Sequence, residues 1–263
     1  MLSFRASGRP IAASLVWLAL GGGAAEAASC GEAAFEGSRY TVCTADPAQS
    51  NVRIFWRNGD GAPYRTFGAL ADDLAARNLD LAFAMNGGMF GTDYSPIGLY
   101  IEDGKELRPA NNADGPAGVR PVPNFYKKPN GVFYVGPGGA GVVETGSFLS
   151  DKPPADYATQ SGPLLVIDGA IHPAFIVGSS DRRRRAGVGV CEANEVRFAI
   201  SEDAVNFHDF ARFFRDHLGC PNALFLDGGA GSGLHAPELS RSDWPGHGGY
   251  GPMIGVVSSA GSQ

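Results

Sequence analysis

The sequence lacks the features that mark several large classes of protein. Its 21 basic residues are outnumbered by 27 acidic ones, which gives a net charge of -6. Proteins that bind nucleic acids need a basic face for the phosphates, so we expect no nucleic-acid partner. No apolar stretch approaches the about 20 residues that a membrane-spanning helix needs. We therefore expect no transmembrane segment.

Metal-binding motifs are missing as well. The five histidines are scattered without H-x-H or H-E-x-x-H spacing, and the four cysteines form no C-x-x-C pair. These spacings are typical of zinc and redox sites, so we expect no metal site built from these residues. The sequence requires no cofactor, and it leaves open whether a divalent metal assists. It also leaves the oligomeric state open.

The glycine-rich run after Asp227 lacks the residues of the familiar glycine motifs. No lysine follows it, as a phosphate-binding P-loop requires, and Ala230 and Leu234 stand where a dinucleotide fingerprint needs glycine. Ser232 is flanked by Ala230-Gly and Gly-Leu234, which does not fit the G-x-S-x-G turn of a hydrolase nucleophile. The run therefore needs another explanation.

The chain begins with the pattern of an export signal. Arg5 and Arg9 precede a mostly apolar stretch at Ile11–Leu20, and an A-x-A cleavage site ends at Ala27. We therefore predict a signal peptide over residues 1–27 and a periplasmic or secreted mature protein. The alternative is a buried N-terminal helix.

Four cysteines in an exported chain favour two disulfides. Three pairings are possible, and we favour the two local ones, Cys30–Cys43 and Cys191–Cys220. Closing such loops contributes roughly 3 kcal/mol each in the chain-entropy model. A lipid anchor on Cys30 is the less favoured alternative, because the preceding residues lack the usual leucine.

The composition and the patterns predict one α/β (mixed α+β) domain with a mixed sheet. Hydrophobic residues make up 44% of 263, enough for a large core, and 38 glycines with 18 prolines favour turns and short strands. We expect an N-terminal disulfide-linked hairpin at 28–50, followed by the main domain at 51–260. Two strand–helix–strand units are predicted within it: Val52–Trp56, Leu70–Asn78 and Leu79–Met85, then Val196–Ser201, Asn206–Leu218 and Ala223–Leu226.

Each predicted unit ends in a polar residue followed by two glycines. The first ends in Asn86-Gly87-Gly88 and the second in Asp227-Gly228-Gly229. Ligands of open α/β sheets gather at the carboxyl ends of strands, so we expect both tips to face one shared cleft. Glycines let a ligand approach the backbone, and their N–H groups can bind oxygen anions. A plain Asp-Gly turn explains Asp227 equally well.

Two further stretches carry candidate polar groups. Arg182 and Arg185 belong to the only dense basic run, and Arg185 leads directly into a strand, where it could clamp a phosphate; a solvated loop is the alternative. Gln160 and Ser161 precede a strand, and Gln160 could bind sugar hydroxyls, although a structural turn is also possible. The Pro-rich segment 110–123 is predicted to be an irregular loop that covers a site.

Together these stretches resemble the phosphodiester glycosidase family. The resemblance rests on Asn86-Gly-Gly-Met-Phe, Gln160-Ser-Gly-Pro, Arg185-Ala-Gly-Val-Gly and Leu226-Asp-Gly-Gly, in this order, and it is closest to a bacterial secreted branch. It implies a mixed α/β domain that hydrolyses a sugar from a phosphodiester, so a carbohydrate or sugar phosphate is the expected partner. The serine of the family's glycine run is displaced by one residue, to Ser232.

The resemblance also implies residue roles. Asn86, Arg185 and Asp227 would be catalytic. The substrate would be bound by Gly87, Gly88, Gln160, Ser161, Arg182, Gly228 and Gly229. Glycosidases commonly use two carboxylates, and Glu102 and Glu202 are weak candidates for the second. Two other functions stay open: a polysaccharide-binding protein without catalysis, and a hydrolase of exopolysaccharide or peptidoglycan that needs no phosphate.

Overall fold

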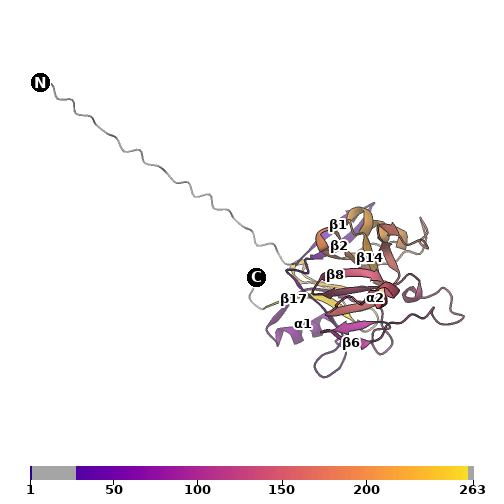
Figure 1. Ribbon diagram of the computed structural model, residues 1–263, viewed down its shortest axis with the longest axis horizontal. Coiled ribbons are helices and arrows are strands. Elements are labelled where there is room, and N and C mark those ends of the chain that lie inside the picture. Colours follow the sequence, from indigo (N-terminus) through magenta and orange to yellow (C-terminus); the bar gives the residue numbers. More distant parts are fainter. Residues whose placement is uncertain (2–27, 260–263) are drawn as a thin grey trace.

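The computed structural model describes Met1 and residues 28–259, and this part of the chain folds mostly into β-strands (Figure 1). The signal peptide predicted for residues 1–27 lies, apart from Met1, outside the described residues. The described strands form three sheets, and their paired strands run antiparallel. The fold is therefore of the α+β kind, with three short helices in the described residues, which confirms the mixed α+β part of the prediction. The predicted α/β units and mixed sheet are wrong, because the paired strands are antiparallel.

Within each sheet, the strands lie side by side in an order that differs from their order in the sequence. The seven-stranded sheet contains β1 (Ala28–Phe35), β2 (Ser38–Ala45), β13 (Val196–Ser201), β12 (Arg185–Val190), β14 (Asn222–Gly228), β10 (Leu164–Ile167) and β11 (Ala170–Ile171). The second sheet contains β16 (Arg241–Ser242), β15 (Leu234–Ala236), β4 (Leu79–Asn86), β17 (Met253–Ser259) and β3 (Asn51–Phe55). The third contains β6 (Lys105–Arg108), β5 (Tyr100–Glu102), β9 (Tyr157–Ser161), β7 (Gly131–Gly136) and β8 (Gly139–Glu144). The helices are α1 (Phe67–Ala75), α2 (Thr145–Asp151) and α3 (Phe207–Arg212).

Both predicted strand–helix–strand segments exist, but their strands do not pair with each other. In the first, β3 and β4 are joined by α1, and β17 lies between them, antiparallel to both. In the second, β13 and β14 are joined by α3, and β12 lies between them in the same way. The two strands of each segment thus run in the same direction, separated by a strand from elsewhere in the sequence.

The helices begin where side chains cap them. Thr66 caps α1 by accepting a hydrogen bond from the Ala69 N–H, and Asn206 caps α3 by accepting one from the Asp209 N–H at 2.8 Å. Beyond its last residue, α3 continues into a π-helical turn at Phe213–His217.

The core is divided by the seven-stranded sheet. On one face, a central cluster that includes Phe83, Phe133 and Leu226 fills the space between the three sheets. On the other face, α3 packs an aromatic cluster against the sheet, with Tyr40 stacked on Phe213 at 3.7 Å between ring centroids. In Figure 1 this part, with β1, β2 and β14, lies at the top of the view, and α1 and β6 lie at the bottom.

The two disulfides have the predicted pairing. Cys30 and Cys43 are cross-strand partners in the β1–β2 hairpin, and Cys191 is joined to Cys220. The hairpin continues the seven-stranded sheet through the pairing of β2 with β13. None of the helices in the described part of the chain combines the length and the apolar character needed to cross a membrane.

Candidate functional site

Asp227 lies at the end of β14, where the buried strand reaches the protein surface. Its side chain is half-buried, and its Oδ1 accepts a 2.7 Å hydrogen bond from the Gly228 N–H. The other oxygen, Oδ2, accepts no hydrogen bond from the described residues. Burial raises the pKa of Asp227 to about 6, opposed by the Gly228 N–H and the nearby His247. A carboxyl group with this pKa changes its charge close to neutral pH.

A β-bulge at Leu226 sets the direction of this carboxyl group. Ala186 pairs with Asp227, but Gly187 pairs with Phe225, so Leu226 is an extra residue in β14. Because paired residues share a face of the sheet, Asp227 projects on the same face as Ala186, which belongs to the central core. In a regular strand it would share a face with Phe225 instead.

The glycine run shapes the space around Asp227. A Cβ atom at Gly231 would lie 2.2 Å from Asp227 Oδ2, so only glycine leaves room for the carboxyl group. Ser232 is buried, and its hydroxyl donates to the Asp227 carbonyl at 3.2 Å. The displaced serine therefore supports the turn. The Gly229 N–H donates to the Arg184 carbonyl, so it is not available for an oxygen anion.

Asn86 lies at the end of β4 and turns toward the same glycine run. It is almost fully buried, and its Oδ1 accepts a 3.0 Å hydrogen bond from the Gly233 N–H. Its Nδ2 is also buried and has no hydrogen-bond partner among the described residues. A buried amide without a partner costs free energy unless a ligand or a water completes it, so this N–H₂ group is a candidate donor to substrate.

Gly87 and Gly88 connect Asn86 to β9. The Thr159 hydroxyl donates to the Gly87 carbonyl at 2.9 Å, and the Ser161 hydroxyl donates to the Leu226 carbonyl at 2.9 Å. Gly88 has φ +142°, and an added Cβ would lie 3.0 Å from Thr159 Oγ1, so this position requires glycine. Its N–H makes no hydrogen bond to the described residues. The two predicted tips and Ser161 thus belong to one connected site.

Gln160 does not present its amide to this site. Its Oε1 accepts hydrogen bonds from the Leu99 N–H at 3.0 Å and the Asn111 N–H at 2.9 Å, and its Nε2 donates to the Asn111 carbonyl. The side chain is buried. Gln160 therefore holds the start of the 110–123 loop against β9, directly beside Ser161.

The Arg185 guanidinium lies on the other face of the seven-stranded sheet from Asp227. Arg185 precedes Ala186 in β12, and side chains alternate along a strand. Its Nε and Nη2 donate to the Val205 and Asp181 carbonyls, both at 2.9 Å, and its Cζ lies 3.7 Å from the Phe207 ring centroid. Burial lowers the pKa of Arg185 to about 10, so the guanidinium stays charged at neutral pH.

Arg185 and Arg182 both hold neighbouring segments of the chain together through hydrogen bonds to backbone carbonyls. Arg182 donates to the Ala204 carbonyl at 3.1 Å and pairs with Asp209 of α3 at 3.3 Å. The Arg185 Nη1 has no hydrogen-bond partner among the described residues. The phosphate clamp that the sequence predicted for Arg185 therefore stays a prediction, and it would have to act from across the sheet.

Neither weak candidate for a second carboxylate lies beside Asp227. Glu202 pairs with Arg241 and accepts a 2.7 Å hydrogen bond from the Thr41 hydroxyl. Glu102 follows Tyr100 and Ile101, which pair with Thr159 and Ala158, so it lies toward the Tyr157 end of β9. Since Asp227 lies near the Ser161 end, Glu102 is remote from it. A further carboxylate, Asp243, lies beside the glycine run and accepts a 3.2 Å hydrogen bond from the Leu234 N–H, but it is held in ion pairs with Arg184 and Arg241. Asp227 makes no ion pair with the described residues.

No group of three or more histidine, cysteine or acidic side chains in the described part of the chain is arranged to hold a metal ion. The site instead offers an oxygen of Asp227, the Asn86 Nδ2 and the Gly88 N–H. One acceptor, on a carboxyl group with a pKa of about 6, and two donors without a hydrogen-bond partner among the described residues suit a ligand rich in hydroxyl or phosphate oxygens.

Comparison with known proteins identifies the family to which the chain belongs. A model of the phosphodiester glycosidase family matches residues 80–255. The chain is also 34% identical over 189 residues to the uncharacterized protein YigE of Escherichia coli K12. This match covers 72% of this chain and 70% of YigE. The matched range includes both glycine-flanked tips.

Solved structures show the same fold. The catalytic domain of zebrafish N-acetylglucosamine-1-phosphodiester alpha-N-acetylglucosaminidase, auto-inhibited by its pro-peptide, has a TM-score of 0.59 at 18% identity over 87% of this chain and 81% of that one. A putative exported protein of Burkholderia pseudomallei has a TM-score of 0.54 at 13% identity, over 83% of this chain and 74% of that one. At these identities the likeness concerns the fold alone.

Proposed function

Because the chain belongs to the phosphodiester glycosidase family, we propose that it hydrolyses the bond between a sugar and the phosphate of a sugar-1-phosphodiester or a related envelope glycan. The observation that carries this proposal is the half-buried Asp227, whose pKa of about 6 and free Oδ2 suit it to chemistry near neutral pH. The two disulfides of the chain are typical of proteins in an oxidising compartment, so we further propose that the mature protein is periplasmic or secreted.

Asp227 would act at the anomeric carbon of the sugar. The bond from this carbon to the phosphate oxygen breaks, water supplies the new hydroxyl group, and the products are a free sugar and a phosphomonoester. Asp227 in its ionised form would attack the carbon or remove a proton from the water. A phosphate group leaves as a stable anion, so it needs no proton from a second acid. Asp227, which makes no ion pair with the described residues, can therefore suffice as the one reacting carboxylate.

The unpartnered donors would hold the substrate. The Asn86 Nδ2 and the Gly88 N–H lie on the same tip, and both are free to donate to sugar or phosphate oxygens. Asn86 is fixed by its hydrogen bond to the Gly233 N–H, so its amide is oriented before substrate binds. Gln160 would act indirectly, by holding the loop that begins at Asn111.

The test is a kinetic comparison on an aryl sugar phosphodiester. We expect the Asp227→Asn variant to lose at least 100-fold in kcat, in the range typical for removal of a general acid or base. Asp60→Asn, at an exposed turn, is the matched control and should keep wild-type activity. Equal rates for wild type and Asp227→Asn would remove Asp227 from the reaction.

A substrate panel separates the other functions. Envelope glycans with and without phosphodiesters are incubated with the protein, and released reducing sugar and phosphomonoester are measured separately. Release of sugar from phosphate-free glycans alone would indicate an ordinary glycoside hydrolase. Binding that depends on Asp227 without any turnover would indicate a polysaccharide-binding protein.

A further inference from the structure

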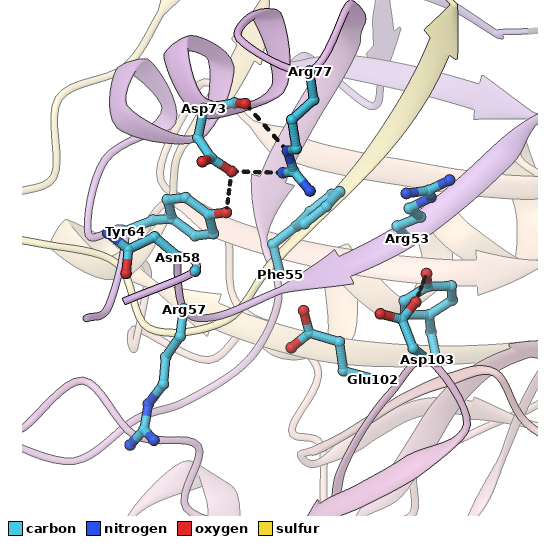
Figure 2. A pocket seen from close by; sticks show the side chains of 11 residues that line it. Arg53, Phe55, Arg57, Asn58, Tyr64, Asp73, Arg77, Glu102 and Asp103 are labelled. Atoms are coloured by element: carbon cyan, nitrogen blue, oxygen red, sulfur yellow. Dashed lines mark hydrogen bonds and ion pairs between the residues drawn. The ribbon is translucent and has the colours of Figure 1, made fainter. Parts of the chain in front are cut away.

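A polar cavity lies away from Asp227, between β3, the end of α1 and β5 (Figure 2). Its volume is about 270 Å³, and Tyr157, at the start of β9, lines it. Ser161, which belongs to the Asp227 site, ends the same strand. Four residues along a strand span about 13 Å, so the two sites are separate.

The carboxyl groups at this cavity are held in place by tyrosines. Each of three acidic side chains accepts one hydrogen bond from a tyrosine hydroxyl. The pairs are Tyr64 with Asp73 at 2.5 Å, Tyr157 with Asp103 at 2.5 Å, and Tyr100 with Glu102 at 2.6 Å. In each pair the second carboxyl oxygen accepts no hydrogen bond from the described residues. Burial and the neighbouring carboxylate raise the pKa of each of these tyrosines, which keeps the hydroxyl as a donor.

Three arginines at the cavity, Arg53, Arg57 and Arg77, offset the negative charge of these three acidic side chains. Arg77 pairs with Asp73, but Arg53 and Arg57 make no ion pair within the described residues. The Arg57 guanidinium lies 3.5 Å from the Trp56 ring centroid, which fixes it beside the cavity. In Figure 2, Asp73 and Arg77 lie on the opposite side of the view from Glu102.

This arrangement suits a ligand with many hydroxyl groups and no net charge. Three oriented carboxylates offer free acceptor oxygens, and Arg53 and Arg57 offer free donors, so vicinal hydroxyls can bond to both. The cavity as a whole is neutral, with three acidic and three basic side chains, and it gives no advantage to a charged ligand. Its volume is close to the lower end of the about 300 to 1,000 Å³ that is common for ligand sites.

We propose that this cavity is a second carbohydrate-binding site, which takes one neutral sugar unit. It does not use Asp227 or Asn86, and it does not depend on the proposed hydrolysis. It would hold a glycan by a unit other than the one that is cleaved. The carboxylates of Asp73, Glu102 and Asp103 bind the hydroxyls as acceptors, and Arg53 and Arg57 bind them as donors.

Backbone amide NMR of the whole protein locates the binding. N-acetylglucosamine is titrated as the neutral probe, and glucuronic acid is the charged comparator. We expect saturable shift changes at Gly59 and Asp103, with glucuronic acid binding no more tightly than N-acetylglucosamine. Shift changes confined to residues around Gly228 would overturn the proposal. Tighter binding of glucuronic acid would overturn the assignment to a neutral sugar.

A pair of glycine substitutions provides a steric test. Gly59 lines the cavity, has no atom within 4 Å of an added Cβ, and has an ordinary φ, so Gly59→Trp can cover the cavity without strain. Gly138, in the β7–β8 turn, is equally open and does not line the cavity, so Gly138→Trp is the matched control. We expect Gly59→Trp to weaken sugar binding at this cavity at least tenfold and Gly138→Trp to leave it unchanged. Unchanged binding in Gly59→Trp would refute the proposal.

Two carboxamide variants separate this site from the catalytic one. Glu102→Gln keeps the side-chain shape and removes the charge, and we expect at least fivefold weaker binding at Gly59 and Asp103. Asp227→Asn should leave this binding unchanged, even if it abolishes hydrolysis. Loss of the shifts at Gly59 in Asp227→Asn would show that the cavity is not an independent site. The proposed hydrolase could therefore fail without this site failing, and the reverse also holds.

Discussion

Replacing Asp227 with asparagine should make the protein more stable at neutral pH while it removes the activity. Burial raises the pKa of this carboxyl group from 3.8 to about 6. A difference of about two pKa units corresponds to ~3 kcal/mol, at 1.36 kcal/mol for each unit. This is the upper limit of what the folded state loses when Asp227 ionises, because the side chain keeps some contact with solvent.

The direction of the pKa shift determines how the stability of the wild type changes with pH. Between about pH 4 and pH 6 the folded protein holds a proton on Asp227 that the unfolded chain has released, so the wild type loses stability as pH rises through this window. Asparagine does not titrate. The difference in unfolding free energy between Asp227→Asn and wild type should therefore be near zero at about pH 4 and reach ~1–3 kcal/mol above pH 6.

Urea unfolding at a series of pH values, with the disulfides intact, measures this difference directly. All other titrating groups are shared by the two proteins and cancel in the comparison. A difference that is constant across the series, or a wild type that is more stable at pH 7, would refute the reasoning. The same ionisation should appear in the pH–rate profile, where activity that needs the carboxylate falls below about pH 6.

Three further predictions test the parts that surround Asp227. Asn86→Ala removes an oriented donor and should lower kcat more than 10-fold in steady-state kinetics; it also leaves the buried Gly233 N–H without its acceptor, so it should destabilise the fold by ~1–3 kcal/mol in urea unfolding. Gly88→Ala places a Cβ 3.0 Å from Thr159 Oγ1 at φ +142°, and it should destabilise the fold by ~1–3 kcal/mol in urea unfolding; a neutral effect would contradict the geometry. Gln160→Ala frees the start of the 110–123 loop and should speed hydrogen exchange and proteolysis there, whereas an unchanged loop would show that Gln160 does not hold it.

Local patterns in the sequence were sufficient to predict helices and strands, but not to predict which strands pair with each other. The cap at Asn206 and the apolar stripe of α3 are determined by neighbouring residues, and both disulfides join segments close in sequence. The strands that lie between β3 and β4, and between β13 and β14, come from distant parts of the chain. A hydrophobic pattern shows that a strand is buried, but it does not identify which strand lies beside it. The α/β prediction failed for this reason.

The candidate site shows the same limit at the level of single side chains. The two glycine-flanked tips were predictable because polar residues that end apolar strands are conspicuous. The bulge at Leu226 was not, and it decides that Asp227 and the Arg185 guanidinium project from opposite faces. The role of Gln160 was also hidden, because its partners Leu99 and Asn111 are remote in sequence.

The two tips occupy equivalent places in two similar units. In the first, Asn86 ends β4 and pairs with Met253, the first residue of β17. In the second, Asp227 lies near the end of β14 and pairs with Ala186, near the start of β12. Each unit thus has two strands in the same direction, a helix that joins them, and an antiparallel strand between them. The hydrogen bond from Gly233 to Asn86 then joins the units at their tips, and the bond from Ser161 to Leu226 attaches the second tip to β9 of the third sheet. A site formed in this way needs both units folded and in contact, so we expect substitutions at either tip to impair substrate binding and turnover together.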